Sequence, residues 1–174
     1  SAIRIHDETL NFNRIYNYGT FDFEQPNFYL NFCRGKLLYS LDRESYRSFE
    51  RSSVEDRRSL REQVLALTPA QRDRLFKLLE TNALPDNRDY KYDFFYDNCA
   101  TRIRDIVRDA VVAPIAFDSS KLTPGVTMRQ LLRPYLKPHP WTQFGIDLVL
   151  GVPTDRVASI EQAMFLPDRL HDAF

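Results

Sequence analysis

The sequence lacks several features that would assign it to a familiar class. Its 174 residues include two cysteines, too few for a disulfide-rich scaffold. The five glycines form no glycine-rich phosphate-binding loop. No run of 18 apolar residues occurs, so we expect that this chain does not itself span a membrane. The three histidines do not have metal-ligand spacing, and the net charge is zero. We therefore expect no metal, no cofactor and no nucleic-acid partner.

The residues that are present suit a folded enzyme or binding domain. Apolar residues make up 43% of the chain and aromatic residues 13%, which is enough for a hydrophobic core. The first part of the chain has mainly strand patterns, whereas residues 98–174 have mainly helical ones. We predict an α+β fold in which a small antiparallel sheet packs on a helix that carries Cys99. Residues 1–112 would form the core, and residues 113–174 a helical extension packed on it.

Local patterns predict the individual elements. Strands are predicted at 1–6, 14–19, 36–41, 59–67 and 90–96. Helices are predicted at 27–34, 44–56, 69–82, 99–110, 128–136 and 141–150, with a last helix that Asp155 caps and that ends near Pro167. Residues 59–67 could be strand or helix. We favour a strand because Thr68-Pro69 begins a new helix at once, with Gln71 completing a capping box.

The stretch from Tyr90 to Asp105 contains the main candidate for a catalytic residue. It is predicted as an aromatic strand, a turn at Asp97-Asn98, and a helix whose first turn contains Cys99. Cys99 lies four residues before Ile103, on the buried face of that helix. A helix N-terminus stabilises a thiolate, so Cys99 is a candidate nucleophile. An inert buried cysteine would occupy the same position, and the local pattern alone favours that alternative.

A cysteine nucleophile needs a base, normally histidine, and this chain offers no convincing one. His139 follows Cys99, as in papain, but it lies between two prolines in a rigid turn. His171 is close to the chain end, and His6 falls on the polar side of its strand. Asn17 is either a residue of the sheet whose polar side chain is hydrogen-bonded there, or a polar group that faces the same groove as Cys99. We expect Cys33 to be a small packed residue.

Several segments together resemble one bacterial family. They are Tyr16–Phe23, Asn27–Phe32 with Arg34-Gly-Lys, Tyr92–Asp105, Trp141–Asp147 and Met164–Pro167. The family is the N-terminal periplasmic domain of the Bacteroides-type lipoprotein N-acyltransferase, and the resemblance covers nearly the whole chain. It implies a circularly permuted papain-like fold of the NlpC type, in which the catalytic histidine comes before the cysteine. That histidine would lie directly before the strand that begins at Ser1, outside this chain.

The resemblance also implies roles for particular residues. Cys99 would be the nucleophile, and Asn98 would be a helix cap or an oxyanion contact. Asn17 or Tyr18 would supply the polar group that orients the histidine.

The implied activity is acyl transfer in the cell envelope. A phospholipid would give its acyl chain to Cys99 as a thioester, and the N-terminal amine of a lipoprotein would then accept it. The protein would be periplasmic and tethered to the inner membrane by segments outside this chain. Without the upstream histidine, we expect little turnover from these 174 residues alone. The alternatives are a thiol peptidase or amidase that acts on cell-wall peptides, and an inactive papain-like binding module.

Overall fold

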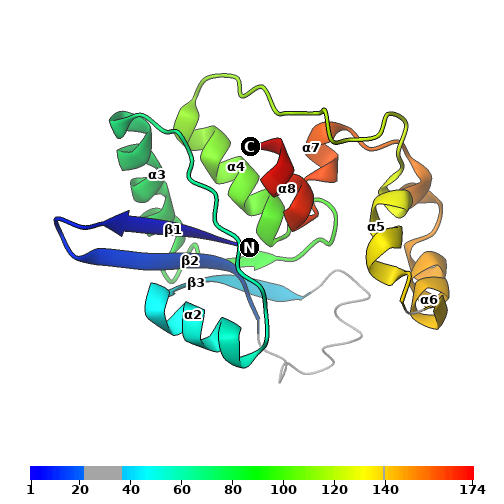
Figure 1. The fold of residues 1–174 in the computed structure, drawn as a ribbon, viewed down its shortest axis with the longest axis horizontal. Helices are drawn as coiled ribbons and strands as arrows, with labels where there is room; N and C mark the ends of the chain where they lie inside the picture. Colours follow the sequence, from blue (N-terminus) through cyan, green and yellow to red (C-terminus); the bar gives the residue numbers. More distant parts are fainter. Residues whose placement is uncertain (22–36, 139) are drawn as a thin grey trace. The chain divides into compact units, whose positions relative to one another are not determined.

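The computed structural model describes residues 1–21, 37–138 and 140–174. It contains two units, Ser1–Ile115 and Ala116–Phe174. The first is a four-stranded sheet with helices, and the second is helical (Figure 1). The predicted α+β class with a small antiparallel sheet is therefore confirmed. The helix predicted at 27–34, together with Cys33, lies outside the described residues.

The sheet is a meander of antiparallel strands. Its strands are β1 (Ala2–Asp7), β2 (Phe12–Thr20), β3 (Leu38–Ser45) and β4 (Asp89–Lys91), in the order β1-β2-β3-β4. The strands predicted at 1–6, 14–19 and 36–41 are thus confirmed. Ala2 pairs with Asn17, and the β2–β3 register shifts between Asn17 and Thr20. Such an irregularity twists a strand locally and changes where its side chains point.

Three helices cover the two faces of this sheet. They are α2 (Tyr46–Glu55), α3 (Pro69–Asn82) and α4 (Cys99–Val111). Figure 1 shows α2 on one face and α3 with α4 on the other. Tyr16, Leu79 and Val107 are almost fully buried. Because they come from β2, α3 and α4, the core of this unit lies between the sheet and those two helices.

Two strand predictions need correction. Residues 59–67 form no strand: Val64 is 95% exposed, and within this segment only Leu65 and Leu67 are half-buried. The aromatic strand ends at Lys91, and residues 94–96 form a turn instead. The Asp93 side chain accepts hydrogen bonds from the backbone N–H groups of Phe95 and Tyr96, both at 2.9 Å. An aspartate that bonds its neighbours in this way favours a turn over a strand.

The second unit contains the remaining helices. They are α5 (Met128–Leu136), α6 (Pro140–Leu150), the 3-10 helix η1 (Val152–Asp155), α7 (Ile160–Ala163) and α8 (Pro167–Ala173). The helices predicted at 128–136 and 141–150 are confirmed. The prediction of a single last helix capped by Asp155 is wrong. The structure has two separate helices there, α7, which Ser159 caps, and α8, and the carboxylate of Asp155 bonds Arg129 Nε at 2.7 Å.

Replacing Thr68 by alanine should destabilise the first unit by about 1 kcal/mol, because α3 begins with the predicted capping box. The Thr68 hydroxyl accepts a hydrogen bond from Gln71 N at 3.3 Å, and Gln71 Oε1 accepts one from Thr68 N at 2.9 Å. Urea denaturation would measure the change. The matched control, Thr68→Ser, keeps the acceptor oxygen and should lose much less. Equal losses for both variants would contradict the capping role.

Candidate active site around Cys99

The first turn of α4 is fixed by Asn98, which is 4% exposed. Its Oδ1 accepts hydrogen bonds from Ala100 N at 2.8 Å and Thr101 N at 3.0 Å. Its Nδ2 donates to the carbonyl oxygen of Phe94 at 2.8 Å, and its backbone N–H donates to the Thr101 hydroxyl at 2.8 Å. Asn98 therefore caps the helix and ties it to the preceding turn, which holds the backbone of Cys99 in place.

Cys99 is the first residue of α4, and its thiol is free and half-buried. It lies against Gly19 of β2: a Cβ atom added to Gly19 would stand 3.8 Å from the Cβ of Cys99. The same point lies 3.3 Å from Asn17 Oδ1 and 4.0 Å from the backbone nitrogen of Ser1. Cys99, Asn17 and the start of β1 thus meet around one glycine, which has no side chain to fill the space between them.

Tyrosines surround the thiol on the sheet side. Burial raises the pKa values of Tyr39, Tyr90 and Tyr92, and the negative charge of an ionised Cys99 raises them further. Phenols with raised pKa values stay protonated at neutral pH, so they surround Cys99 as neutral O–H groups. Tyr39 stacks on Tyr92 with ring centroids 4.2 Å apart, and its ring also lies near those of Phe21 and Tyr90, at 4.8 and 6.1 Å. The tyrosines beside Cys99 therefore stay uncharged, while the Arg102 guanidinium, which pairs with Asp97, lies 4.3 Å from the centroid of the Tyr90 ring.

The side chain of Tyr18 points toward α3. Its side chain is 2% exposed, and its hydroxyl accepts a hydrogen bond from Asn82 Nδ2 of α3 at 3.1 Å. Its carbonyl oxygen accepts the hydroxyl of Tyr90 at 2.5 Å. Of the four residues predicted for the site, the structure brings Cys99, Asn98 and Asn17 together, whereas the hydroxyl of Tyr18 is directed at α3.

The described histidines do not supply an obvious base. His6 is exposed and pairs with Asn13 at the end of β1 remote from Ser1. His171 belongs to α8 in the second unit, and its Nδ1 is buried without a hydrogen-bond partner among the described residues. His139 lies outside those residues. No cluster of side chains suited to a metal ion is found in the part of the chain that the structure describes.

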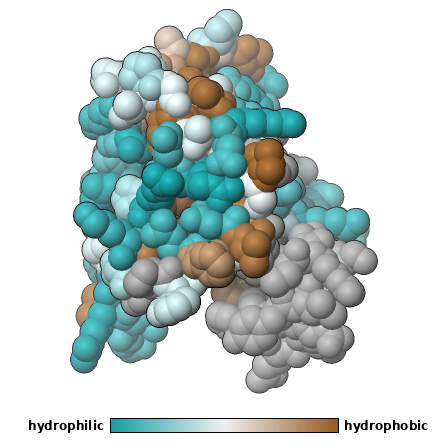
Figure 2. All heavy atoms as spheres, turned by 90° about the vertical axis from the view of Figure 1, so that its right-hand side faces the viewer, coloured by the Kyte–Doolittle hydropathy of each residue, from teal (hydrophilic) through white to brown (hydrophobic). Residues whose placement is uncertain are grey.

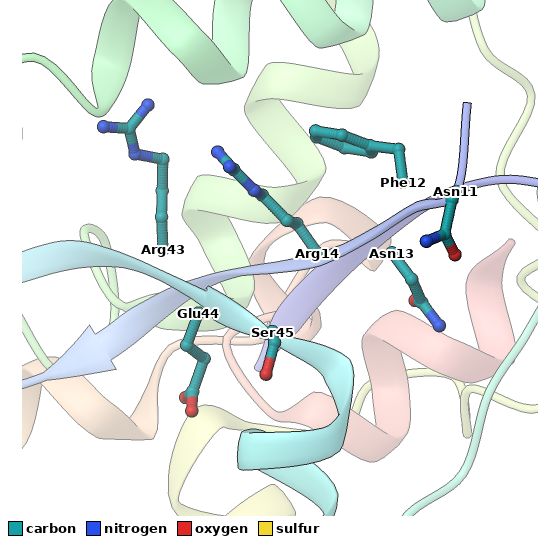
Figure 3. A pocket seen from close by; sticks show the side chains of 7 residues that line it. All are labelled: Asn11, Phe12, Asn13, Arg14, Arg43, Glu44 and Ser45. Atoms are coloured by element: carbon teal, nitrogen blue, oxygen red, sulfur yellow. The ribbon is translucent and has the colours of Figure 1, made fainter.

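A surface hollow of about 480 Å³ lies at the other end of the sheet (Figure 3). It is lined by residues 11–14 of the β1–β2 turn and β2, and by residues 43–45 of β3. Arg14 precedes Gly19 by five residues, which is about 17 Å along a strand. Figure 3 shows Arg14 and Arg43 on one side of the strands and Glu44 on the other, so these charged groups do not converge on a ligand. We assign no function to this hollow.

A family model described as the Lnb N-terminal periplasmic domain matches residues 1–134. The chain belongs to this family. The match spans the sheet, α4 with Cys99, and most of α5, and it confirms the family predicted from the sequence. The segments Trp141–Asp147 and Met164–Pro167 lie beyond it. The family description also makes this a periplasmic domain. No curated protein and no solved structure matches the chain. Among the described residues, no helix is long and apolar enough to cross a membrane.

Sequence reasoning missed two residues of this site, Gly19 and Tyr39. Gly19 follows the Tyr-Asn-Tyr segment of β2, and only the fold brings it against Cys99. Tyr39 lies in β3, where it pairs with Tyr90 of β4. An isolated glycine inside a strand pattern can signal a close backbone approach, and that was the one signal available.

Replacing Gly19 by valine should slow alkylation of Cys99 by iodoacetamide about tenfold, because the new methyl groups would fill the space beside the thiol. Single-residue mass spectrometry would measure the rate. The control is Gly125→Val, whose site has no atom within 4 Å of an added Cβ, although its φ of +75° adds backbone strain. Unchanged alkylation in Gly19→Val would show that the thiol is approached from another side.

Proposed function

We propose that this domain is a thiol acyltransferase of the bacterial cell envelope, with Cys99 as its nucleophile. One observation carries the proposal: within the family-matched region, Cys99 is the first residue of a capped helix and faces a glycine. The N–H groups at a helix N-terminus attract developing negative charge, and Gly19 puts no side chain between Cys99 and Asn17. The phospholipid donor, the lipoprotein acceptor and tethering to the inner membrane belong to the same proposal.

The reaction would proceed in two transfers. The Cys99 thiolate attacks the carbonyl carbon of a phospholipid ester, which forms a C–S bond and breaks the ester C–O bond. The lysophospholipid leaves as an alcohol after taking a proton from the base. The α-amine of the lipoprotein's N-terminal cysteine then attacks the thioester, which forms an amide and releases the thiolate, and the amine proton passes to the base.

The backbone N–H of Cys99 is suited to stabilise the oxyanion of each tetrahedral intermediate. Asn98 occupies the N–H groups of Ala100 and Thr101. The N–H of Cys99 has no acceptor within the described stretches of the chain. A donor at a helix N-terminus, fixed in advance, stabilises developing negative charge without reorganisation.

The base would be a histidine that precedes Ser1. The backbone nitrogen of Ser1 and the Cβ of Cys99 both lie near the position of a Cβ on Gly19, at 4.0 and 3.8 Å. A residue attached before Ser1 would therefore lie near Cys99, and Asn17 would orient it. A cysteine helix packed on an antiparallel sheet, with its histidine supplied from the first strand, is also the arrangement of the proposed permuted papain-like fold.

The full-length protein, including the residues before Ser1, provides the test. It is incubated with phosphatidylethanolamine, and its intact mass is measured for an acyl adduct that hydroxylamine removes. We expect one adduct, which an N-terminal lipopeptide discharges. Cleavage of peptidoglycan fragments without an adduct would favour the peptidase or amidase. Neither activity, with Cys99 inert to alkylation, would favour the binding module.

A further inference from the structure

Helix α6 exposes an apolar stripe, which we define as Trp141, Phe144, Leu148 and Val152. These residues are 86%, 66%, 74% and 80% exposed, respectively. Trp141, Phe144 and Leu148 follow the helical repeat of α6, and Val152 lies in η1, beyond the break at Gly151, whose φ is +61°. Large apolar side chains normally occur singly on the surface of a soluble domain. Four of them on one stripe indicate a surface that contacts something apolar.

The opposite side of α6 faces the rest of its unit. Ile146 and Leu150 are half-buried there. Asp147, the one charged residue of α6, bonds Arg129 Nη1 of α5 at 2.6 Å. The same guanidinium bonds Asp155 at 2.7 Å. Arg129 thus binds both carboxylates of this region, which leaves one net negative charge there, and the exposed side of α6 carries no charged side chain.

Cations flank the stripe. Arg133 and Lys137 lie at the end of α5, just before α6, and Arg156 follows η1. All three are exposed, and none has an ion pair within the described parts of the chain. These three cations outnumber the one net negative charge that Arg129, Asp147 and Asp155 leave, so this surface combines an apolar stripe with excess positive charge.

We propose that α6 lies on the surface of an anionic phospholipid membrane, with the stripe inserted among the acyl chains and the cations facing the headgroups. Eleven residues span about 16 Å as a helix, roughly half a bilayer core, so α6 would lie in the membrane plane. Tryptophan favours the boundary between headgroups and acyl chains, and lysine and arginine attract anionic lipid. Figure 2 shows apolar side chains in groups between hydrophilic ones on the face that it presents.

A second copy of the chain would fit this surface less well. In a symmetric dimer the same patch meets itself. Arg133, Lys137 and Arg156 would then face their own like charges, without the carboxylates that Arg129 engages. Anionic headgroups instead complement those cations. The proposal differs from the predicted tether through segments outside this chain, and it does not depend on the chemistry of Cys99.

Trp141 is the only tryptophan of the 174-residue chain, so its fluorescence reports on the stripe directly. Vesicles of phosphatidylcholine with 30% phosphatidylglycerol are added to the chain. We expect a blue shift of the emission and quenching by lipids brominated on the acyl chain. Pure phosphatidylcholine, or 0.5 M salt, should weaken binding several-fold because the electrostatic part is lost. Phe144→Ser with Leu148→Ser should weaken it by about a hundredfold, since each change removes a large apolar side chain.

A matched control replaces exposed apolar residues of the other unit, Val64→Ser with Leu84→Ser, and should bind as the unchanged chain does. Thermal melts would verify that both double variants remain folded. The proposal is overturned if Trp141 emission does not shift with vesicles, or if both double variants bind equally. Sedimentation would also overturn it by showing that the chain self-associates through the stripe, if the monomer then binds vesicles without a change in Trp141 emission.

Discussion

Replacing Cys99 by serine should lower acyl transfer by the full-length protein by about 10⁴-fold or more, because the step that forms the thioester loses its nucleophile. A serine hydroxyl at the same position stays protonated near neutral pH and is a far weaker nucleophile than a thiolate. The fold should be little affected, because Cys99 is half-buried and Asn98, its neighbour, makes the capping hydrogen bonds. Intact-mass detection of the acyl adduct and the rate of lipopeptide acylation would measure the loss.

The control for this variant is the other cysteine. Cys33→Ala should keep both the adduct and the acylation rate, because the sequence predicts only a packing role for Cys33. If Cys99→Ser retains the adduct, or if Cys33→Ala loses it, Cys99 is not the nucleophile. Loss of the adduct together with loss of the folded state would leave stability as the cause, so the thermal melting temperature of each variant is measured alongside.

The sequence predicted those parts of the fold that depend on neighbouring residues. Thr68 and Asn98 cap their helices as predicted, because a cap involves an acceptor and N–H groups two or three residues away. One failure has a local origin and another a distant one. Aromatic residues favour strands, but the Asp93 carboxylate binds the N–H groups that a strand would need. Aspartate is a residue type that often caps helices, but the carboxylate of Asp155 bonds an arginine that lies 26 residues earlier.

The surroundings of Cys99 depend on contacts far apart in the sequence, which limited their prediction. Gly19 reaches Cys99 through the sheet and the packing of α4, and Tyr39 reaches it from β3. The register shift between Asn17 and Thr20 further changes the alternation of side chains along β2. In a regular strand, the alternation of side chains alone would have predicted which face of the sheet carries Asn17 and which carries Tyr18. The family resemblance identified Cys99 and Asn98 because those residues belong to a contiguous block, whereas Gly19 and Tyr39 acquire their role only from the fold.

Replacing Asn98 by alanine should destabilise the protein by about 2–3 kcal/mol, the largest loss of stability that we expect from one polar side chain here. Asn98 is buried, and the change removes the acceptor for two helix N–H groups and the donor to the carbonyl of Phe94. In a chain of this size the melting temperature should fall by about 4–12 °C. Urea denaturation would give the free energy of unfolding, and hydrogen exchange should be faster at Ala100 and Thr101 than elsewhere in α4.

Asn98→Ser separates the two functions of this side chain. Serine keeps a capping oxygen but lacks the amide that binds Phe94, so it should cost about 1 kcal/mol and leave exchange at Ala100 and Thr101 slow. Equal losses for serine and alanine would mean that the bond to Phe94 dominates and that the cap contributes little. In that case the preceding turn, and not the cap, would hold the backbone of Cys99. Alkylation rates of Cys99 in the two variants would then change together, whereas the capping role predicts a change in Asn98→Ala alone.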